Sequence, residues 1–373
     1  MAEKTKKETA GDEKHFSADS MTFLRRLLDA PGPSGFEIAA ARVWREEAER
    51  VADRVDADVS GNSLATINPG GSPRVMLAGH IDEIGLIITH IDEEGFLYFD
   101  GIGGWDAQVL LGQRVRVLAR DGEVTGVVGT KPIHLMKPDE REKAVKLTDL
   151  WIDVGVKDRA AATARGLRVG DPAVIDVSMV TLGGDLIASR AIDNRIGAFV
   201  VLEALRVLKE EGHTFAAEVT AVATTQEEIG YQGGGARTSA FRLEPEVALV
   251  VDVTFSTDAP RIEKKQTGEH RIGGGPVLGR GSAIHPLVFD RLVDTAEGAD
   301  ISYTIQANAR GTHTDADAIY LSRAGVATGV VSVPNRYMHS PNEIVSLADL
   351  RSTARLLAEF VASLEPSTSF VAR

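Results

Sequence analysis

Apolar residues follow a helical spacing in the first part of the folded chain. The segment SADSMTFLRRLLDA (17–30) has apolar residues on one face of a predicted helix, at Met21, Leu24, Leu27 and Leu28. A second helical pattern covers 37–52 after the break PGPSGFE. The short apolar run RVMLAGH (74–80) then predicts a buried strand that ends at His80.

The pattern changes to strict alternation between residues 84 and 182. GLIITHIDEEGFLYFD (85–100) and RVRVLARDGEVTGVVG (114–129) each alternate apolar and polar residues around a Glu-Gly or Asp-Gly turn, which is typical of antiparallel hairpins. WIDVGV (151–156) and PAVIDVSMV (172–180) continue this style. We therefore predict a β-rich, barrel-like domain over 84–182, inserted into a larger domain.

Strands and helices alternate after residue 183. An amphipathic helix is predicted over 194–212, ending at Gly212, and further helices over 286–297 and 347–364. Ser346 is the expected N-cap of the last helix, with Asp349 completing a capping box. Three apolar runs predict strands: AAEVTAVATTQEE (216–228), EVALVVDV (246–253) and GVATGVVSV (325–333). This alternation predicts an α/β fold with a mainly parallel, doubly wound sheet, formed by residues 18–83 and 183–373.

Composition narrows the class of protein. The 373 residues include 54 acidic and 41 basic side chains, a net charge of −13, which argues against a nucleic-acid or anionic-membrane partner. There is no cysteine, so disulfides and thiolate ligands are excluded. No apolar run approaches the roughly 20 residues that span a bilayer. Met1 to about His15 has lysines but no apolar segment, so we predict a disordered tail over 1–17 and a cytoplasmic protein.

Histidine, aspartate and glutamate follow the predicted strands. Five separate segments supply them: His80 and Asp82, Asp193, Glu227 and Glu228, Asp252, and His339. Each has a simpler explanation when taken alone, as a hydrogen-bonding histidine, a helix N-cap or a solvated glutamate pair. The carboxyl ends of parallel strands share one edge, however, and ligands bind there. The joint pattern therefore predicts a site.

The chemistry of this set favours divalent metal ions. Two imidazoles with several carboxylates and no thiolate suit zinc, cobalt or manganese. The set is large enough for two ions bridged by one carboxylate: His80, Asp193, Glu228, Asp252 and His339. One glutamate of the adjacent pair then serves as a ligand and the other as a general base. In an extended chain, the Asp82 carboxylate meets the His80 ring and fixes its tautomer.

Other catalytic motifs are missing from the sequence. It contains no G-x-S-x-G, no P-loop, no G-x-G-x-x-G and no H-E-x-x-H. The glycine clusters at 230–237 and 271–283 are capable of holding an anion, but we interpret them as turns near the site. The loop His313-Thr314-Asp315 is a candidate lining of the site, whereas His134 is given no catalytic role.

Five ordered motifs resemble a known family. AGHIDEIG, SRAIDNRIG, TTQEEIG, VVDVT and RYMHSPNE are similar, in order and spacing, to the motifs of dinuclear metal aminopeptidases related to glutamyl aminopeptidase. These are the tetrahedral aminopeptidases, some of which were once labelled cellulase M or endoglucanase. The resemblance covers nearly the whole chain from about residue 18, including the inserted domain.

The resemblance implies a zinc-exopeptidase-like fold and roles for individual residues. Asp193 is expected to bridge two metal ions, and Glu227 to be the general base, with Asp82 orienting His80. We expect His80 with Glu228 on one ion and Asp252 with His339 on the other; the alternative pairs His80 with Asp252 and Glu228 with His339. The insertion is expected to be a dimerisation domain, with dimers assembling into a hollow dodecamer.

The implied reaction is removal of N-terminal residues from short peptides. Metal-bound hydroxide attacks the scissile carbonyl, and the general base passes the proton to the leaving amine. Two alternatives are a glycosidase, in which two carboxylates serve as acid and base, and a non-catalytic assembly protein. The paired histidines have no role in a glycosidase.

Two departures from the family pattern affect the prediction of substrate preference. Tyr231-Gln232-Gly233-Gly234 replaces an Arg-Gly-Ala-like sequence, and Phe255 occupies a position where histidine is common. A preference for acidic residues needs a cation in the pocket, and the sequence offers Arg237, Arg280 and Arg310 in candidate loops.

Overall fold

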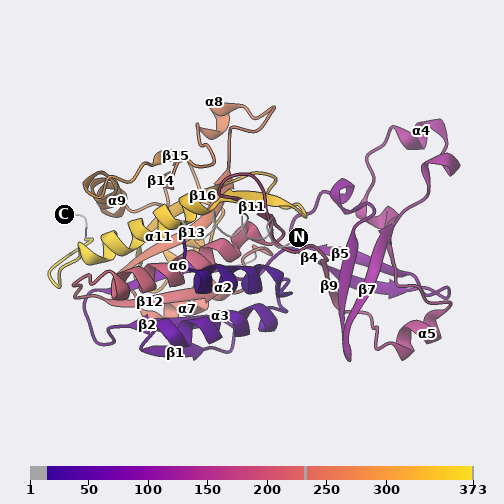
Figure 1. The fold of residues 1–373 in the computed structure, drawn as a ribbon, viewed down its shortest axis with the longest axis horizontal. Coiled ribbons are helices and arrows are strands. Elements are labelled where there is room, and N and C mark those ends of the chain that lie inside the picture. The colour runs from indigo at the N-terminus through magenta and orange to yellow at the C-terminus, as the bar shows by residue number, and fades with distance from the viewer. Residues whose placement is uncertain (1–14, 231–232, 372–373) are drawn as a thin grey trace, which may run out of the picture.

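The chain forms a large α/β domain with a smaller β domain at one end (Figure 1). The computed structural model describes residues 15–230 and 233–371. Of the tail predicted over 1–17, residues 1–14 lie outside the described residues. Phe16 and Ser17 belong to the fold instead: Phe16 is buried against Phe199, with ring centroids 5.0 Å apart, and the Ser17 side chain accepts the N–H of Ser20.

A mixed sheet forms the centre of the large domain. Within the described residues it has eight strands, in the order β1-β2-β12-β3-β13-β16-β14-β15. The neighbours β12, β3, β13 and β16 run parallel, whereas β1, β2 and β14 add antiparallel pairings. The strands are β1 (Arg54–Ala57), β2 (Ser63–Ile67), β3 (Arg74–His80), β12 (Glu218–Thr224), β13 (Val247–Phe255), β14 (Val277–Gly281), β15 (Thr304–Asn308) and β16 (Ala327–Asn335). The predicted α/β class with a mainly parallel central sheet is confirmed.

One buried helix, α6 (Ile192–Glu210), lies on the centre of the sheet. It contacts β3, β12 and β13, and it is covered in turn by α2, α3 and α11. Gly79 in β3 lets the helix approach closely, because a Cβ there would lie 2.4 Å from the backbone of Gly197 in α6. The N-terminus of α6 is thereby held beside the carboxyl end of β3. The other helices are α2 (Ala18–Asp29), α3 (Ile38–Val51), α7 (Gly234–Leu243), α8 (Lys264–Thr267), α9 (Pro286–Gly298), α10 (Ala316–Ile319) and α11 (Leu347–Ala362).

The inserted segment folds as a closed barrel, as the alternating pattern predicts. In the described part of the chain its six strands are ordered β4-β5-β8-β7-β6-β9 around a separate hydrophobic core. They are β4 (Gly85–Ile91), β5 (Leu97–Ile102), β6 (Arg114–Ala119), β7 (Gly122–Gly129), β8 (Trp151–Asp153) and β9 (Pro172–Ile175). Short helical segments lie between the strands: η1 (Ala107–Leu110), η2 (Ile133–Leu135), α4 (Pro138–Arg141), η3 (Leu147–Asp149) and α5 (Arg159–Ala164).

A small sheet follows the barrel and leads back into the large domain. Its described strands are β10 (Val180–Thr181), β11 (Leu186–Ser189) and β17 (Glu343–Ser346). Ser346 caps α11 as predicted, since its side chain accepts the N–H groups of Ala348 and Asp349. The predicted capping box is wrong, because the Asp349 carboxylate accepts the N–H groups of Gly273 and Gly275 instead. No described helix is long and apolar enough to cross a membrane.

Candidate metal centre

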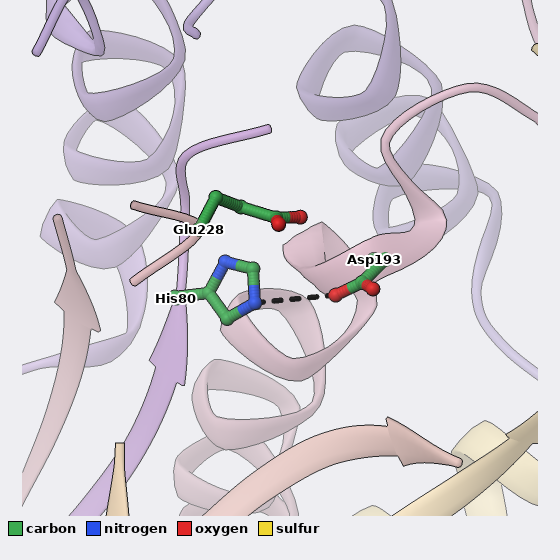
Figure 2. A group of neighbouring side chains, drawn as sticks. All are labelled: His80, Asp193 and Glu228. Atoms are coloured by element: carbon green, nitrogen blue, oxygen red, sulfur yellow. Dashed lines mark ion pairs between the residues drawn. The ribbon is translucent and has the colours of Figure 1, made fainter. Parts of the chain in front are cut away.

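The predicted site residues meet at one edge of the central sheet. His80 ends β3, Asp252 lies toward the end of β13, and the Glu227-Glu228 pair follows β12. Asp193 is in the first turn of α6, and His339 lies between β16 and β17. Figure 2 shows three of these side chains, His80, Asp193 and Glu228, gathered where strand, helix and loop converge. The parallel topology explains the convergence, because it directs the strand ends to the same edge.

Asp193 lies between the two histidines. Its Oδ1 is 3.2 Å from His80 Nε2, and its Oδ2 is 3.3 Å from His339 Nε2. Its neighbour Asn194 fixes the start of α6: the Asn194 amide donates to the Val251 carbonyl at 2.8 Å and accepts the N–H of Gly197 at 3.0 Å. With the start of α6 held in this way, the Asp193 carboxylate presents Oδ1 to the His80 imidazole and Oδ2 to the His339 imidazole.

Further carboxylates extend the cluster on both sides of Asp193. His80 Nε2 lies 3.9 Å from Asp252 Oδ1 and 3.7 Å from Glu227 Oε2. His339 Nε2 lies 3.2 Å from Glu228 Oε2. One ligand atom each of His80, Asp193 and Glu228 also lie within 4.8 Å of one another, as expected of groups that hold a metal ion.

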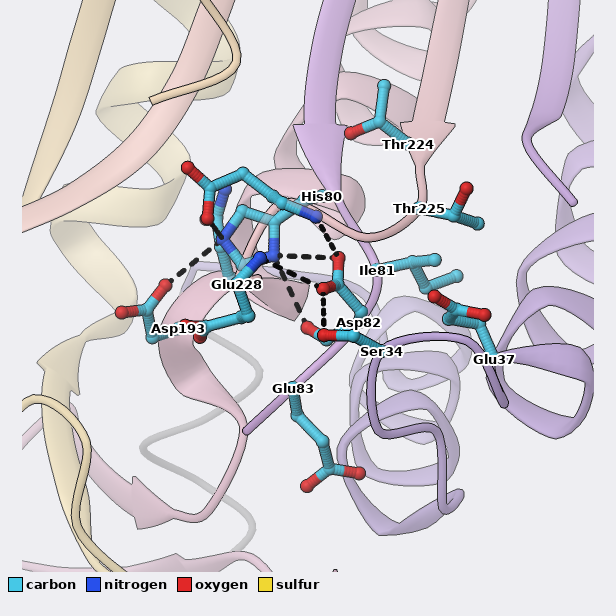
Figure 3. Close-up of polar contacts among 12 residues, drawn as sticks. Ser34, Glu37, His80, Ile81, Asp82, Glu83, Asp193, Thr224, Thr225 and Glu228 are labelled. Atoms are coloured by element: carbon cyan, nitrogen blue, oxygen red, sulfur yellow. Dashed lines mark hydrogen bonds and ion pairs between the residues drawn. The ribbon is translucent and has the colours of Figure 1, made fainter. Parts of the chain in front are cut away.

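Asp82 connects the two segments that carry the cluster (Figure 3). Its Oδ1 lies 3.4 Å from His80 Nδ1 and accepts the N–H of Glu227 at 3.2 Å, and its Oδ2 accepts the N–H of Glu228 at 3.1 Å. Ser34 donates a further hydrogen bond to Oδ2 at 2.6 Å. We predicted the contact with His80 from the spacing of two residues. The hold on the glutamate pair was not predicted, because it depends on how β12 and β3 pair.

The inserted domain also reaches the cluster. His339 Nδ1 donates to the Gly104 carbonyl at 2.9 Å, which leaves Nε2 free to face Asp193 and Glu228. The loop containing Gly104 is held by Trp105, whose indole N–H donates to the Gly85 carbonyl at 2.7 Å. Apart from the glycines of GIGGW, no sequence signal indicated this contact, since 235 residues separate its partners.

The carboxylates repel one another in this buried setting. Burial, and then repulsion from Asp252, Asp315 and Glu228, raises the pKa of Glu227 to about 10 against the attraction of His80. Burial and the neighbouring Asp193 likewise raise the pKa of Glu228 to about 7. Glu228 Oε1 is buried with no hydrogen-bond partner in the described structure. A surplus of buried negative charge with a free carboxylate oxygen fits a cation site.

The imidazoles provide the positive charge beside Asp193. Hydrogen bonds with Asp193 and Glu228 raise the pKa of His339 to about 11. Burial raises the pKa of Asp193, but hydrogen bonds with His339 and His80 outweigh it and lower this pKa to about 2. An imidazole must lose its proton from the ligating nitrogen before it can bind a metal ion. Bound metal ions would therefore replace the imidazole protons as the source of positive charge.

A cavity of about 1250 Å³ opens beside the cluster. Its lining includes the candidate residues Asp193, Glu227, Glu228, Asp252 and His339, together with Phe255. His313, Thr314 and Asp315 also line it, as the sequence suggested, and buried Asp315 accepts a hydrogen bond from Thr224. His134 is exposed on η2 of the inserted domain.

One of the three arginines considered for substrate selection lies at this cavity. Arg237 is among the lining residues, whereas Arg280 stacks on Phe289 and lies 3.8 Å from Asp290. The segment 231–234 departs from the family pattern, and its residues Tyr231 and Gln232 lie outside the described residues.

An α/β fold with a buried histidine, a partly exposed histidine and several carboxylates at the carboxyl edge of its sheet is typical of metal-dependent hydrolases. Comparison with known families specifies the class further. The M42 glutamyl aminopeptidase family matches residues 61–356, and the chain belongs to this family. It is accordingly a metalloaminopeptidase, which confirms the family and the enzyme class predicted from the motifs.

Relatives and solved structures agree with this assignment over nearly the full length. The chain is 34% identical to the lysyl aminopeptidase of Pyrococcus furiosus, covering 92% of this chain and 97% of the relative. It is similar to the TET aminopeptidase of the marine sediment archaeon Thaumarchaeota archaeon SCGC AB-539-E09, with 36% identity, a TM-score of 0.88 and coverage of 93% and 97%. It is also similar to the Pyrococcus horikoshii TET1 peptidase, which can assemble into a tetrahedron or a large octahedral shell, with 29% identity, a TM-score of 0.80 and coverage of 92% and 100%.

Proposed function

We propose that this aminopeptidase removes N-terminal residues from short peptides with two divalent ions, zinc, cobalt or manganese. The ligands are His80, Asp193, Glu228, Asp252 and His339. The position of Asp193 carries the proposal, because each of its two oxygens faces a different imidazole at 3.2 and 3.3 Å. A bridging carboxylate between two ions needs this arrangement.

The shortest contacts favour a pairing of ligands that differs from the one we expected, although ligand atoms of His80, Asp193 and Glu228 also lie within 4.8 Å of one another. Asp252 lies beside His80 at 3.9 Å, and Glu228 lies beside His339 at 3.2 Å. We therefore assign His80 and Asp252 to one ion and Glu228 and His339 to the other, with Asp193 shared. The expected pairing of His80 with Glu228 had followed the family resemblance, which fixes the residues but not their distances.

Glu227 is the proposed general base. Divalent ions supply Lewis-acid chemistry when bound: they lower the pKa of water and polarise a carbonyl. Glu227 lines the cavity, and its backbone is fixed by Asp82, with its Oε2 3.7 Å from His80 Nε2. It can take a proton from water on the cavity side and give it to the leaving amine.

The size of the cavity supports short peptides as substrates. The assembly of a related peptidase supports a closed homo-oligomer as the active form. A volume of about 1250 Å³ exceeds the roughly 300–1000 Å³ of most small-molecule pockets. The related TET1 peptidase can form a tetrahedron or a larger shell. We propose that the inserted barrel provides the dimer contact and that dimers form a dodecamer in the cytoplasm, which keeps folded proteins away from the site.

A substrate panel tests this function. The purified protein is treated with EDTA, dialysed, and assayed with aminoacyl anilides and with a β-glucan after addition of Co²⁺, Zn²⁺ or Mn²⁺. We expect anilide hydrolysis to be lost with EDTA and restored by metal, and the glucan to remain uncleaved. Glucan cleavage that persists in EDTA would support the glycosidase alternative instead.

A further inference from the structure

Glu343 has no role in the proposed chemistry, although it lies directly behind the site. It begins β17, opposite Ser189 of β11, and its side chain is buried, with 2% exposure. Its Oε2 accepts the backbone N–H of Asp193 at 2.9 Å, and its Oε1 accepts the backbone N–H of His339 at 2.8 Å. One side chain thus holds the main chain of two proposed ligands.

The His339 backbone has an unfavourable conformation that needs such a hold. His339 has a φ of 59° and Tyr337 a φ of 62°, in the left-handed region that residues other than glycine rarely adopt. Such a conformation persists only where the surroundings fix it. The hydrogen bond to Glu343 fixes the His339 backbone, and the Gly104 carbonyl fixes its ring.

Glu343 is placed to support ligands, not to bind an ion itself. Each of its oxygens accepts an amide N–H, and the side chain is not part of the lining of the large cavity. It borders instead a separate cavity of about 10 Å³ behind Asp193 and Glu228, with room for about one water molecule.

We propose that Glu343 is a positioning residue for the ion held by Glu228 and His339, acting through the backbone of Asp193 and His339. This inference rests on the proposed function. Asp82 supports the site in a comparable way, since it contacts the His80 ring and accepts the backbone N–H groups of Glu227 and Glu228. Each buried carboxylate thereby fixes two chain segments relative to each other.

Glu343→Gln tests the proposal with little change in volume. The amide keeps one acceptor oxygen but presents an NH₂ group to the other backbone N–H, so one hydrogen bond is lost. Asp349→Asn is a matched control, because Asp349 is also buried and accepts two backbone N–H groups, from Gly273 at 2.7 Å and Gly275 at 2.8 Å. Asp349 is outside the lining of the large cavity.

Metal-stripped wild type and both variants are titrated with CoCl₂, followed by visible absorption and calorimetry. Wild type is expected to bind two ions. In Glu343→Gln the affinity for one ion should fall by about 10–100-fold, the usual effect of losing a group that orients a ligand. The other ion should lose less affinity, because Asp193 is the one ligand it shares with the disturbed segment, whereas His339 is disturbed as well at the first ion. Excess Co²⁺ should restore the spectrum. Asp349→Asn should lower the melting temperature and leave both affinities unchanged.

Two results would overturn the positioning role: unchanged binding of both ions by Glu343→Gln, or equal losses in Glu343→Gln and Asp349→Asn. Wild type that fails to bind two ions would overturn the proposed function itself, which separates the two failures. If Glu343→Gln does not fold, Glu343→Asp replaces it, because its shorter side chain keeps the carboxyl group but cannot span both N–H groups. Unchanged cobalt binding by that variant would equally contradict the proposal.

Discussion

The adjacent residues Glu227 and Glu228 have different surroundings at this site. Glu228 lies 3.2 Å from His339 and has an unpartnered buried oxygen, whereas Glu227 lines the cavity with its side chain partly exposed. Asp82 fixes both backbones, so the two side chains diverge from a common support. The pair is therefore expected to respond differently to the same substitution.

Glu227→Gln should retain both metal ions and lower kcat by roughly 10²–10⁴-fold, the usual contribution of a general base. Glu228→Gln should instead weaken metal binding, with activity partly rescued at high metal concentration. Metal analysis and steady-state kinetics on both variants separate these effects. An unchanged kcat in fully metallated Glu227→Gln would show that Glu227 is not the base.

Glu37 gives a prediction on pH. Burial raises its pKa to about 7 from 4.5, helped by repulsion from Asp82 and opposed by the hydrogen bond from the Gly35 N–H. A carboxyl group with a raised folded-state pKa destabilises the fold as the pH rises from 4.5 to 7, by up to about 3 kcal/mol for this interval. Glu37→Gln should thus flatten the decline in unfolding free energy over that range. The measurement is urea unfolding of wild type and variant at several pH values between 4.5 and 7. If the unfolding free energies of both proteins fell in parallel with rising pH, the prediction would be refuted.

At the scale of elements, the sequence predicted the parts that depend on local pattern. The helices containing Leu27 and Phe199, the barrel strands and the strand ending at His80 all follow from the spacing of apolar residues. The polar residues after the strands could be grouped because parallel strand ends share an edge. The contact of Gly104 with His339 could not be predicted from the sequence, because it depends on how the barrel packs against the large domain.

That contact predicts a link between the barrel and the site. A Cβ on Gly104 would lie 3.3 Å from His339 Nδ1, so Gly104→Ala should displace the ring by a few tenths of an ångström. We expect a several-fold loss of affinity for one Co²⁺ ion, smaller than the roughly 10–100-fold loss expected when an orienting group is removed. Gly183→Ala is the control, since a Cβ at Gly183 would have no atom of the described residues within 4 Å. Equal cobalt affinities in the two variants would argue against the link.

At the scale of the whole molecule, the barrel projects away from the α/β domain (Figure 1). The closed barrel leaves no free edge among its described strands, but its domain exposes the apolar side chains of Val127, Ile133 and Leu135, a surface suited to pairing with a second copy. We predict a closed homo-oligomer, at least a dimer, whose activity is confined to short unfolded peptides. Size-exclusion chromatography with light scattering, combined with assays on folded and unfolded substrates, checks this. A fully active monomer at micromolar concentration that trims folded proteins would contradict both parts.

A crystal structure of the cobalt-loaded enzyme, with anomalous scattering at the cobalt edge, tests the dinuclear site most directly. The proposed function predicts two anomalous peaks on either side of the Asp193 carboxylate. One peak should be coordinated by His80 and Asp252, and the other by Glu228 and His339. A single peak, or two peaks that do not share Asp193, would contradict the dinuclear site.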